Sequence, residues 1–217
     1  MPDSEVPRLN MRDVLRAISD NFNLDRGLLR TLLDLCRAPR DLVHTYFFCD
    51  RRRYTQPPTL LMLMLAAVVL SCRHFLPVSN TYSPNLILKI TASTAAELRV
   101  LLLLREYDDV LRLILVPATS LISYTLFRRQ GWNFAEHLAF NAYVLAFQFF
   151  LTAVLLPFCG LAWEWIPGVA TIVYFLTTYA RVMDGPWPLS LLKAVVILGL
   201  SNQIFLIVFY PLTIWLM

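Results

Sequence analysis

The sequence predicts an all-α membrane protein, a polytopic membrane helical bundle of about five transmembrane helices with further helices on the cytoplasmic side. Three observations predict this class: the overall hydrophobicity, a series of long apolar runs, and the clustering of arginine between those runs. Hydrophobic residues make up 58% of the 217 residues, and the mean hydropathy is +0.58. Both values exceed those of soluble globular domains, so lipid is the expected surroundings of most of the chain.

The positive charge of the chain indicates which class of partner it binds. A net charge of +4 is compatible with nucleic-acid binding. The basic residues, however, lie before and between the apolar runs instead of forming one basic stripe. We therefore expect membrane lipids with anionic headgroups as partners, and no nucleic acid. Among the 19 basic residues only Lys89 and Lys193 are lysine, a bias that we interpret as typical of a GC-rich bacterial genome.

Residues 1–54 are predicted to form a cytoplasmic region of amphipathic helices on the membrane surface, ahead of a transmembrane bundle over residues 55–217. Between Arg26 and Arg37, apolar side chains fall on one arc at a period of 3.6 residues, opposite charged ones. These apolar residues are Leu28, Leu29, Leu32, Leu33, Leu35 and Cys36. Such a face suits the headgroup boundary, although a helix pair packed on itself in the cytoplasm would show the same pattern. The basic residues expected at the membrane surface are Arg26, Arg30, Arg37, Arg51, Arg52 and Arg53.

Five apolar runs are long enough to cross a hydrocarbon core, which takes roughly 17–25 helical residues. They lie at about 57–76, 110–127, 135–157, 164–183 and 191–216. Between the first two, the turn-rich stretch PVSNTYSPN leads into a helix expected at about 86–104 on the outer side. This helix either lies on the outer leaflet or re-enters the bilayer, and the sequence leaves both open.

The distribution of arginine predicts the orientation, because basic residues that flank a span stay in the cytoplasm. With the N-terminus inside, the N-terminal region, the Arg128-Arg129 turn and the turn between Arg181 and Lys193 are all cytoplasmic. They hold 14 of the 19 basic residues. An odd number of spans then leaves the C-terminus outside. We expect the membrane to be the bacterial inner membrane.

Motifs for catalysis and metal binding are missing from the sequence. The four cysteines show neither a CxxC pair nor metal-ligand spacing, so we expect free thiols and no metal site. The three histidines lie in different parts of the chain, and no glycine-rich phosphate loop, GxSxG or HExxH motif occurs. No catalytic residue and no cofactor are therefore predicted.

The best local cluster of candidate functional residues opens the third span, at WNFAEH. Asn133 and Glu136 have the spacing of a capping box, with asparagine in place of the usual serine or threonine. A cap explains these two residues structurally. The functional interpretation is that Glu136 and His137 form a proton-handling or ligand-binding pair, because ionisable groups at membrane depth usually have a role. We also predict an ion pair between Glu136 and Arg181 at the cytoplasmic interface.

Polar side chains form a stripe on three of the predicted spans. On the third span, His137, Asn141 and Gln148 fall within about 40° of one another at 100° per residue. The stripes on the second and fourth spans consist of Arg112, Thr119 and Ser123, and of Thr171, Tyr174, Thr178 and Arg181. Facing stripes either hydrogen-bond the helices together or line a passage for a small solute, ion or lipid headgroup. The candidate functional residues are Asn133, Glu136, His137, Asn141, Gln148 and Arg181.

Two stretches, GLLRTLLDLCRAPRDLVHTYFFCDRRRYTQPP and FRRQGWNFAEHLAF, carry a resemblance to a known family. They resemble a bacterial family of inner-membrane proteins catalogued as a domain of unknown function. The family's motifs fall on Thr31, Leu32, Leu35, Pro39, Tyr46, Arg51, Tyr54 and Pro57, and on Asn133, Glu136 and His137. The chain departs at Cys49, where the family usually has glycine, and it lacks the N-terminal zinc ribbon of many members. The resemblance covers most of residues 22–150 and implies a membrane location without an activity.

In layout alone, the chain is also similar to the five-span Yip-type membrane proteins of trafficking and lipid organisation. Three functional hypotheses follow from the sequence. The leading one is a non-enzymatic inner-membrane protein that binds, moves or organises a small molecule or lipid, with a transporter included in this class. The second is a membrane scaffold that recruits a partner through its N-terminal helices, and the third is a membrane-embedded enzyme that uses Glu136 and His137. A homo-oligomer is open under each of them.

Overall fold

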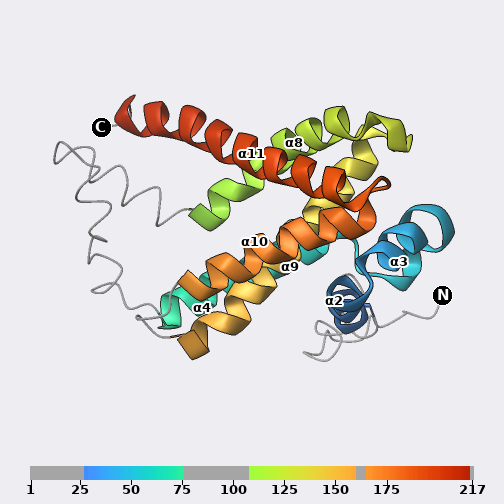
Figure 1. Ribbon diagram of the computed structural model, residues 1–217. Helices are drawn as coiled ribbons and strands as arrows, with labels where there is room; N and C mark the ends of the chain where they lie inside the picture. Colours follow the sequence, from blue (N-terminus) through green and yellow to red (C-terminus); the bar gives the residue numbers. More distant parts are fainter. Residues whose placement is uncertain (1–26, 76–107, 160–164, 216–217) are drawn as a thin grey trace, which may run out of the picture.

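The computed structural model describes residues 27–75, 108–159 and 165–215, and within these ranges the chain forms helices and turns without any strand (Figure 1). Three helical segments are long and apolar enough to cross a membrane, namely Arg51–Phe75, Phe134–Cys159 and Trp187–Ile204. The all-α class is thereby confirmed for the described residues, and these three helices are candidates for the predicted membrane spans. The helix expected at 86–104 lies outside the described residues.

Five long helices overlap the five predicted apolar runs. They are α4 (Pro57–Phe75), α8 (Asp108–Leu126), α9 (Phe134–Cys159), α10 (Trp165–Val182) and α11 (Trp187–Trp215). Helix α4 begins at Pro57 because proline is tolerated in the first turn, where its missing N–H would have no partner. For the same reason α11 begins before the predicted start at 191, since Pro188 lies in its first turn.

Helix α9 lies at the centre of the bundle and packs against α4, α8 and α10, while α11 packs on α8 and α10. In Figure 1, α4, α9 and α10 run alongside one another, and α11 crosses α8 above them in this view. The α9 side chains Phe140, Tyr143 and Phe147 are buried in the core. A helix that is apolar on all sides and buried on most of them is what a central position requires.

The outer surface of the long helices is apolar. Large hydrophobic side chains such as Met62, Leu70, Val154, Val173 and Leu200 are exposed on it. Soluble proteins rarely expose apolar surface over several helices, whereas lipid covers such a surface without cost. The exposed side chains therefore agree with the membrane location that the helix lengths indicate.

The segment before α4 consists of short elements: α2 (Leu28–Arg37), α3 (Pro39–His44), the π-helical turn η1 (Thr45–Cys49) and the 3-10 turn η2 (Arg51–Arg53). Pro39 cannot continue α2 and takes the first position of α3 instead. These elements pack against α9 and α10 near the start of α9 and the end of α10 (Figure 1).

This packing corrects the prediction that the whole leucine arc of residues 26–37 faces the membrane. Leu32 and Leu35 are buried in the core of the molecule, because α2 docks on the bundle with this part of the arc. Leu29 and Leu33 lie on the outer part of the arc and are exposed. An apolar arc on a helix shows only that it faces something apolar, and protein and lipid both meet that requirement.

Candidate functional site

The turn between α8 and α9 leads into the start of α9, which carries most of the candidate site residues. After α8, the 3-10 turn η3 (Arg128–Gln130) ends at Gly131, whose φ of 74° lies in the left-handed region that favours glycine. The Asn133 amide then donates to the Glu136 carboxylate at 2.8 Å, and the Glu136 amide donates to Asn133 Oδ1 at 2.9 Å. This reciprocal pair is the capping box that the Asn-x-x-Glu spacing predicts.

His137 points away from that cap into the bundle. Its side chain is 0% exposed, and Nδ1 lies 2.9 Å from Oγ of Ser123 on α8. The rings of Trp132 and Tyr124 lie 5.5 and 5.8 Å from the imidazole. Glu136 and His137 therefore face different surroundings, and the structure does not bring them together as a pair.

Asn141, one turn further along α9, continues the polar cluster towards α10. Its Nδ2 donates to the carbonyl of His137 at 2.9 Å, and its Oδ1 accepts a hydrogen bond from the Tyr179 hydroxyl at 2.6 Å. We call the four residues Ser123, His137, Asn141 and Tyr179 the polar junction, since they join α8, α9 and α10.

The donors in the polar junction can be followed in order. Because Nδ2 of Asn141 donates to a carbonyl, Oδ1 is its acceptor, and it takes the single proton of the Tyr179 hydroxyl. We assign the imidazole proton of His137 to Nδ1, which then donates to the Ser123 oxygen. This tautomer leaves the other ring nitrogen, Nε2, as a lone-pair acceptor.

Nε2 of His137 is buried, and no group in the described part of the chain hydrogen-bonds to it. Both amide atoms of Gln130, on the turn before α9, are buried and unpartnered within the same ranges. Most buried polar atoms in proteins are satisfied, so such groups call for a ligand, an ordered water or a catalytic role.

The other predicted stripe residues hold helices together. Gln148 donates to the carbonyl of Thr171 on α10 at 3.2 Å, and Thr119 on α8 lies 3.1 Å from Ser201 on α11. Thr178 is buried, whereas the side chain of Arg112 lies outside the described residues. The stripes on the second, third and fourth helices thus meet, and most of their contacts are interhelical hydrogen bonds.

The predicted ion pair between Glu136 and Arg181 does not form. Over the described ranges, the ion pairs within 4.0 Å are Arg30–Asp34 and Arg40–Asp184. Arg181 is exposed, and the Glu136 carboxylate accepts a hydrogen bond from the Asn133 amide in the capping box. Helices α9 and α10 pack against each other, but a carboxylate that binds its own helix start no longer needs a cation.

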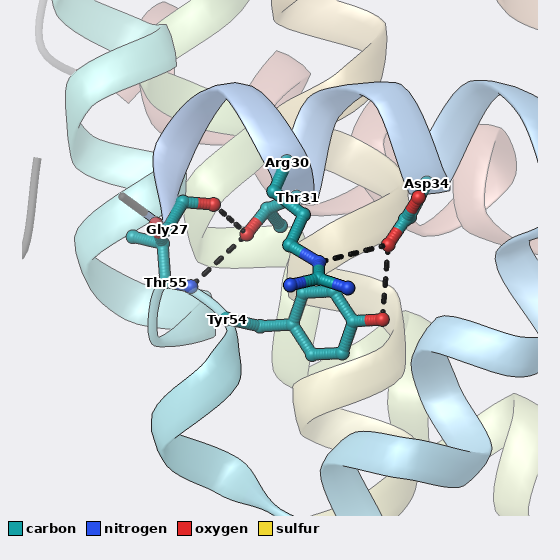
Figure 2. A network of polar contacts seen from close by, with 6 residues as sticks. All are labelled: Gly27, Arg30, Thr31, Asp34, Tyr54 and Thr55. Atoms are coloured by element: carbon teal, nitrogen blue, oxygen red, sulfur yellow. Dashed lines mark hydrogen bonds and ion pairs between the residues drawn. The ribbon is translucent and has the colours of Figure 1, made fainter. Parts of the chain in front are cut away.

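A second polar cluster fixes α2 to the bundle (Figure 2). Thr31 Oγ1 donates to the Gly27 carbonyl at 2.5 Å and accepts from the Thr55 amide at 3.0 Å. The Thr55 carbonyl accepts from the Tyr143 hydroxyl of α9 at 2.7 Å. We call Thr31, Thr55 and Tyr143 the anchor. Beside it, the Tyr54 hydroxyl donates to Asp34 at 3.0 Å.

The predicted surface arginines are placed as follows. Arg30 lies 3.8 Å from Asp34, and Arg37 and the three arginines of η2 are exposed. Arg26 lies outside the described residues. The four cysteines form no disulfide with one another, and no group of three or more His, Cys, Asp or Glu side chains in the described ranges is placed to hold a metal ion.

Comparison of the chain with models of protein families, with curated proteins and with solved structures finds no match. What the chain itself shows is a helical protein with three helices long and apolar enough to cross a membrane and a buried polar junction on its central helix. The function is therefore argued from these contacts.

Proposed function

We propose that the chain is a five-span protein of the bacterial inner membrane that binds or moves a small molecule carrying a hydrogen-bond donor at His137. The single observation that carries this proposal is the buried, unpartnered Nε2. Leaving a buried acceptor unpaired costs about 1–3 kcal/mol, whereas a bound N–H or O–H group removes that cost. The hydrogen bond at Nδ1 holds the ring so that Nε2 presents its lone pair.

The surroundings of His137 favour a small organic molecule over a metal ion. Trp132 and Tyr124 offer aromatic faces next to the imidazole, and the nearest polar groups are neutral. A typical ligand site combines apolar or aromatic walls with a few fixed polar groups. The unpartnered amide of Gln130, on the adjoining turn, offers both a donor and an acceptor at the same end of the bundle.

The enzymatic alternative receives less support from the contacts. Glu136 is bound to Asn133, and His137 is turned away from it, so the two groups do not share a proton path. The scaffold alternative would use the exposed parts of α2 and η1 to recruit a partner.

Native mass spectrometry of the full chain in nanodiscs tests the proposal. We expect wild type to retain a small polar molecule that His137→Phe loses, because phenylalanine fills similar volume without an acceptor. Thr119→Val, which removes a hydrogen bond elsewhere on α8, should retain the molecule and serves as the matched control. Equal retention by His137→Phe would refute the site.

Nitrogen NMR of histidine-labelled protein gives a second readout that does not depend on co-purification. The signal of His137 is assigned by its loss in His137→Phe, and we expect an unprotonated Nε2. A protonated Nε2 would reverse the donor order of the polar junction and contradict the proposal.

A further inference from the structure

Helix α2 exposes an apolar strip that the described part of the chain leaves uncovered. Leu29 is 70% and Leu33 43% exposed, although both belong to the same leucine arc as the buried Leu32 and Leu35. Cys36 continues the strip by one turn, and Phe48 of η1 is exposed as well. A helix that docks on a bundle normally turns its remaining face to water, and that face is then polar.

The side chains of α2 divide into three faces instead of two. The buried face consists of Thr31, Leu32 and Leu35, the exposed apolar strip of Leu29, Leu33 and Cys36, and the charged face of Arg30, Asp34 and Arg37. At about 100° per residue, each face covers roughly a third of the helix circumference. The bundle covers the buried face and water suits the charged face, while nothing in the described part of the chain covers the exposed apolar strip.

The position of α2 along α9 and α10 identifies what covers the exposed apolar strip. The Tyr174 hydroxyl of α10 reaches the Leu35 carbonyl at 3.4 Å, and the Tyr46 ring of η1 packs edge-on against Tyr143 of α9 at 5.4 Å. With a rise of about 1.5 Å per residue, both receiving tyrosines lie about 12–14 Å inside the ends of α9 and α10. A headgroup layer is only roughly 5–8 Å thick, so contacts this far along a span reach the level of the acyl chains.

Exposed arginines lie next to the apolar strip of α2. Arg37, Arg51, Arg52 and Arg53 are exposed, and none of them has a carboxylate within 4.0 Å in the described part of the chain. In an anionic leaflet, arginines bind the phosphates, and an apolar strip contacts the acyl chains that lie deeper. The arginines and the strip of α2 have this arrangement. Stable protein interfaces, in contrast, engage about 20–30 residues a side, far more than this strip offers.

We infer that α2 is wedged into the cytoplasmic leaflet, with the strip of Leu29, Leu33 and Cys36 against acyl chains of anionic phospholipid and the arginines at phosphate level. The anchor holds the helix at this depth from the protein side. This inference rests on the membrane insertion of α9 and α10 proposed above and does not depend on the ligand of His137. A lipid-facing strip beside a bundle that is also apolar makes one continuous acyl-contact surface.

Two neighbouring labels test the wedge in the full chain. A fluorophore is attached to Cys36, on the apolar strip, or to Arg37→Cys, on the charged face, after the other cysteines are replaced by serine. The protein is placed in vesicles of phosphatidylethanolamine and phosphatidylglycerol. We expect brominated lipid to quench the label at 36 several-fold more than the label at 37, and aqueous iodide to show the opposite order.

Each other outcome rejects the inference in a distinct way. Strong iodide quenching at both positions would place the strip in water, available to a soluble partner. Protection of position 36 from both quenchers would show that protein covers it, and crosslinking through Cys36 would identify a second copy as that protein. Equal quenching in vesicles of phosphatidylcholine alone would reject the selectivity for anionic lipid.

Substitutions separate lipid contact from folding. Leu33→Glu should make the label at 36 accessible to iodide while the melting temperature stays near that of wild type, because the residue is exposed. Leu32→Ala should lower the melting temperature and leave the quenching order unchanged, because Leu32 is buried. If Leu33→Glu leaves the label in lipid, the strip does not hold α2 in the leaflet.

Discussion

At the scale of single residues, neighbours in the chain take unrelated roles because each step along a helix turns the side chain by about 100°. Glu136 closes the start of its own helix, whereas His137 joins α9 to α8. A charged group at a helix start is stabilised by the N-terminal dipole and needs no distant partner. A neutral ring in the interior depends on distant partners for every polar atom.

The capping box predicts a specific pattern of coupling. Asn133→Ala and Glu136→Ala should each lower the free energy of unfolding by about 0.5–2 kcal/mol, and the double variant should lose less than the sum, because both remove one reciprocal pair. Denaturation in detergent measures this. The matched pair Glu136→Ala and Arg181→Gln should be additive within about 0.3–0.5 kcal/mol, since the two residues are not in contact. Clear coupling between Glu136 and Arg181 would contradict the structure.

The anchor yields a second prediction. Thr31→Val removes the acceptor of the buried Thr55 amide without changing the side-chain volume much, so we expect a loss of about 1–3 kcal/mol in the free energy of unfolding. Thr177→Val is the control, because the exposed Thr177 hydroxyl bonds only to carbonyls of its own helix. Equal losses for the two variants, measured by thermal unfolding, would mean that the anchor does not fix α2.

Part of these sites is predictable from the sequence, and the rest depends on tertiary packing that the sequence pattern does not reveal. His137, Asn141 and Ser123 stood out because polar side chains are expensive in apolar runs. Tyr179 did not, since an uncharged tyrosine in such a run is expected as ordinary core. Tyr143 and its partner Thr55 are 88 positions apart, and only the packing of α9 against α4 brings them together.

At the scale of the elements, the bundle depends on how helix ends are closed. The last carbonyls of α8 have no partners within the helix. Lys193 of α11 donates to the Leu126 carbonyl at 2.8 Å and lies over the Phe127 ring, 4.7 Å from its centre. In the sequence, Lys193 served only to indicate which side of the membrane its turn occupies, because nothing in the local pattern relates it to α8.

This contact predicts that Lys193→Met destabilises the packing of α8 on α11. Loss of a hydrogen bond from a charged donor costs about 1.5–3 kcal/mol, and methionine retains the apolar stem. Lys193→Arg, which keeps both a donor and a cation, should lose much less. The midpoint of chemical unfolding compares the three proteins, and equal losses for methionine and arginine would show that only the shape of the lysine matters.

Helix bounds were predictable from the sequence because long apolar runs and prolines mark where spans begin and end. The faces of α2 were not. Burial of Leu32 and exposure of Leu29 are decided by where α2 docks, and a periodic arc of leucines is the same for a helix on lipid, on protein or on both.

At the scale of the whole molecule, long-range contacts bring the N-terminal elements to the same side of the bundle as two of the turns between long helices. Arg40 binds Asp184 at 2.8 Å, between α10 and α11, and Phe47 packs on Trp132, just before α9. The N-terminal elements therefore lie on the same side as the turn between α8 and α9 and the turn between α10 and α11. The arginines of all three segments agree with a cytoplasmic location.

The proposed five spans can be separated from a three-span arrangement by the turn between α8 and α9. If α8 crosses the membrane, this turn is cytoplasmic, and Arg129→Cys should react with an impermeant maleimide only after the cells are permeabilised. If α8 does not cross, the same position reacts in intact cells. A phosphatase fused to the C-terminus should be active under the five-span proposal, and an inactive fusion would exclude it.

The contact between Arg40 and Asp184 joins residues 144 positions apart, and the Tyr174 hydroxyl reaches Leu35 over 139 positions. Ribosomes add about 5–20 residues per second, so α2 and α3 wait roughly 7–30 s before the helix that receives them has been synthesised. During biogenesis, the leucines that end up in the core are therefore as open as those of the exposed strip. The nascent N-terminal segment has to be shielded in that interval, and the nearby lipid surface is available for this before the bundle is complete.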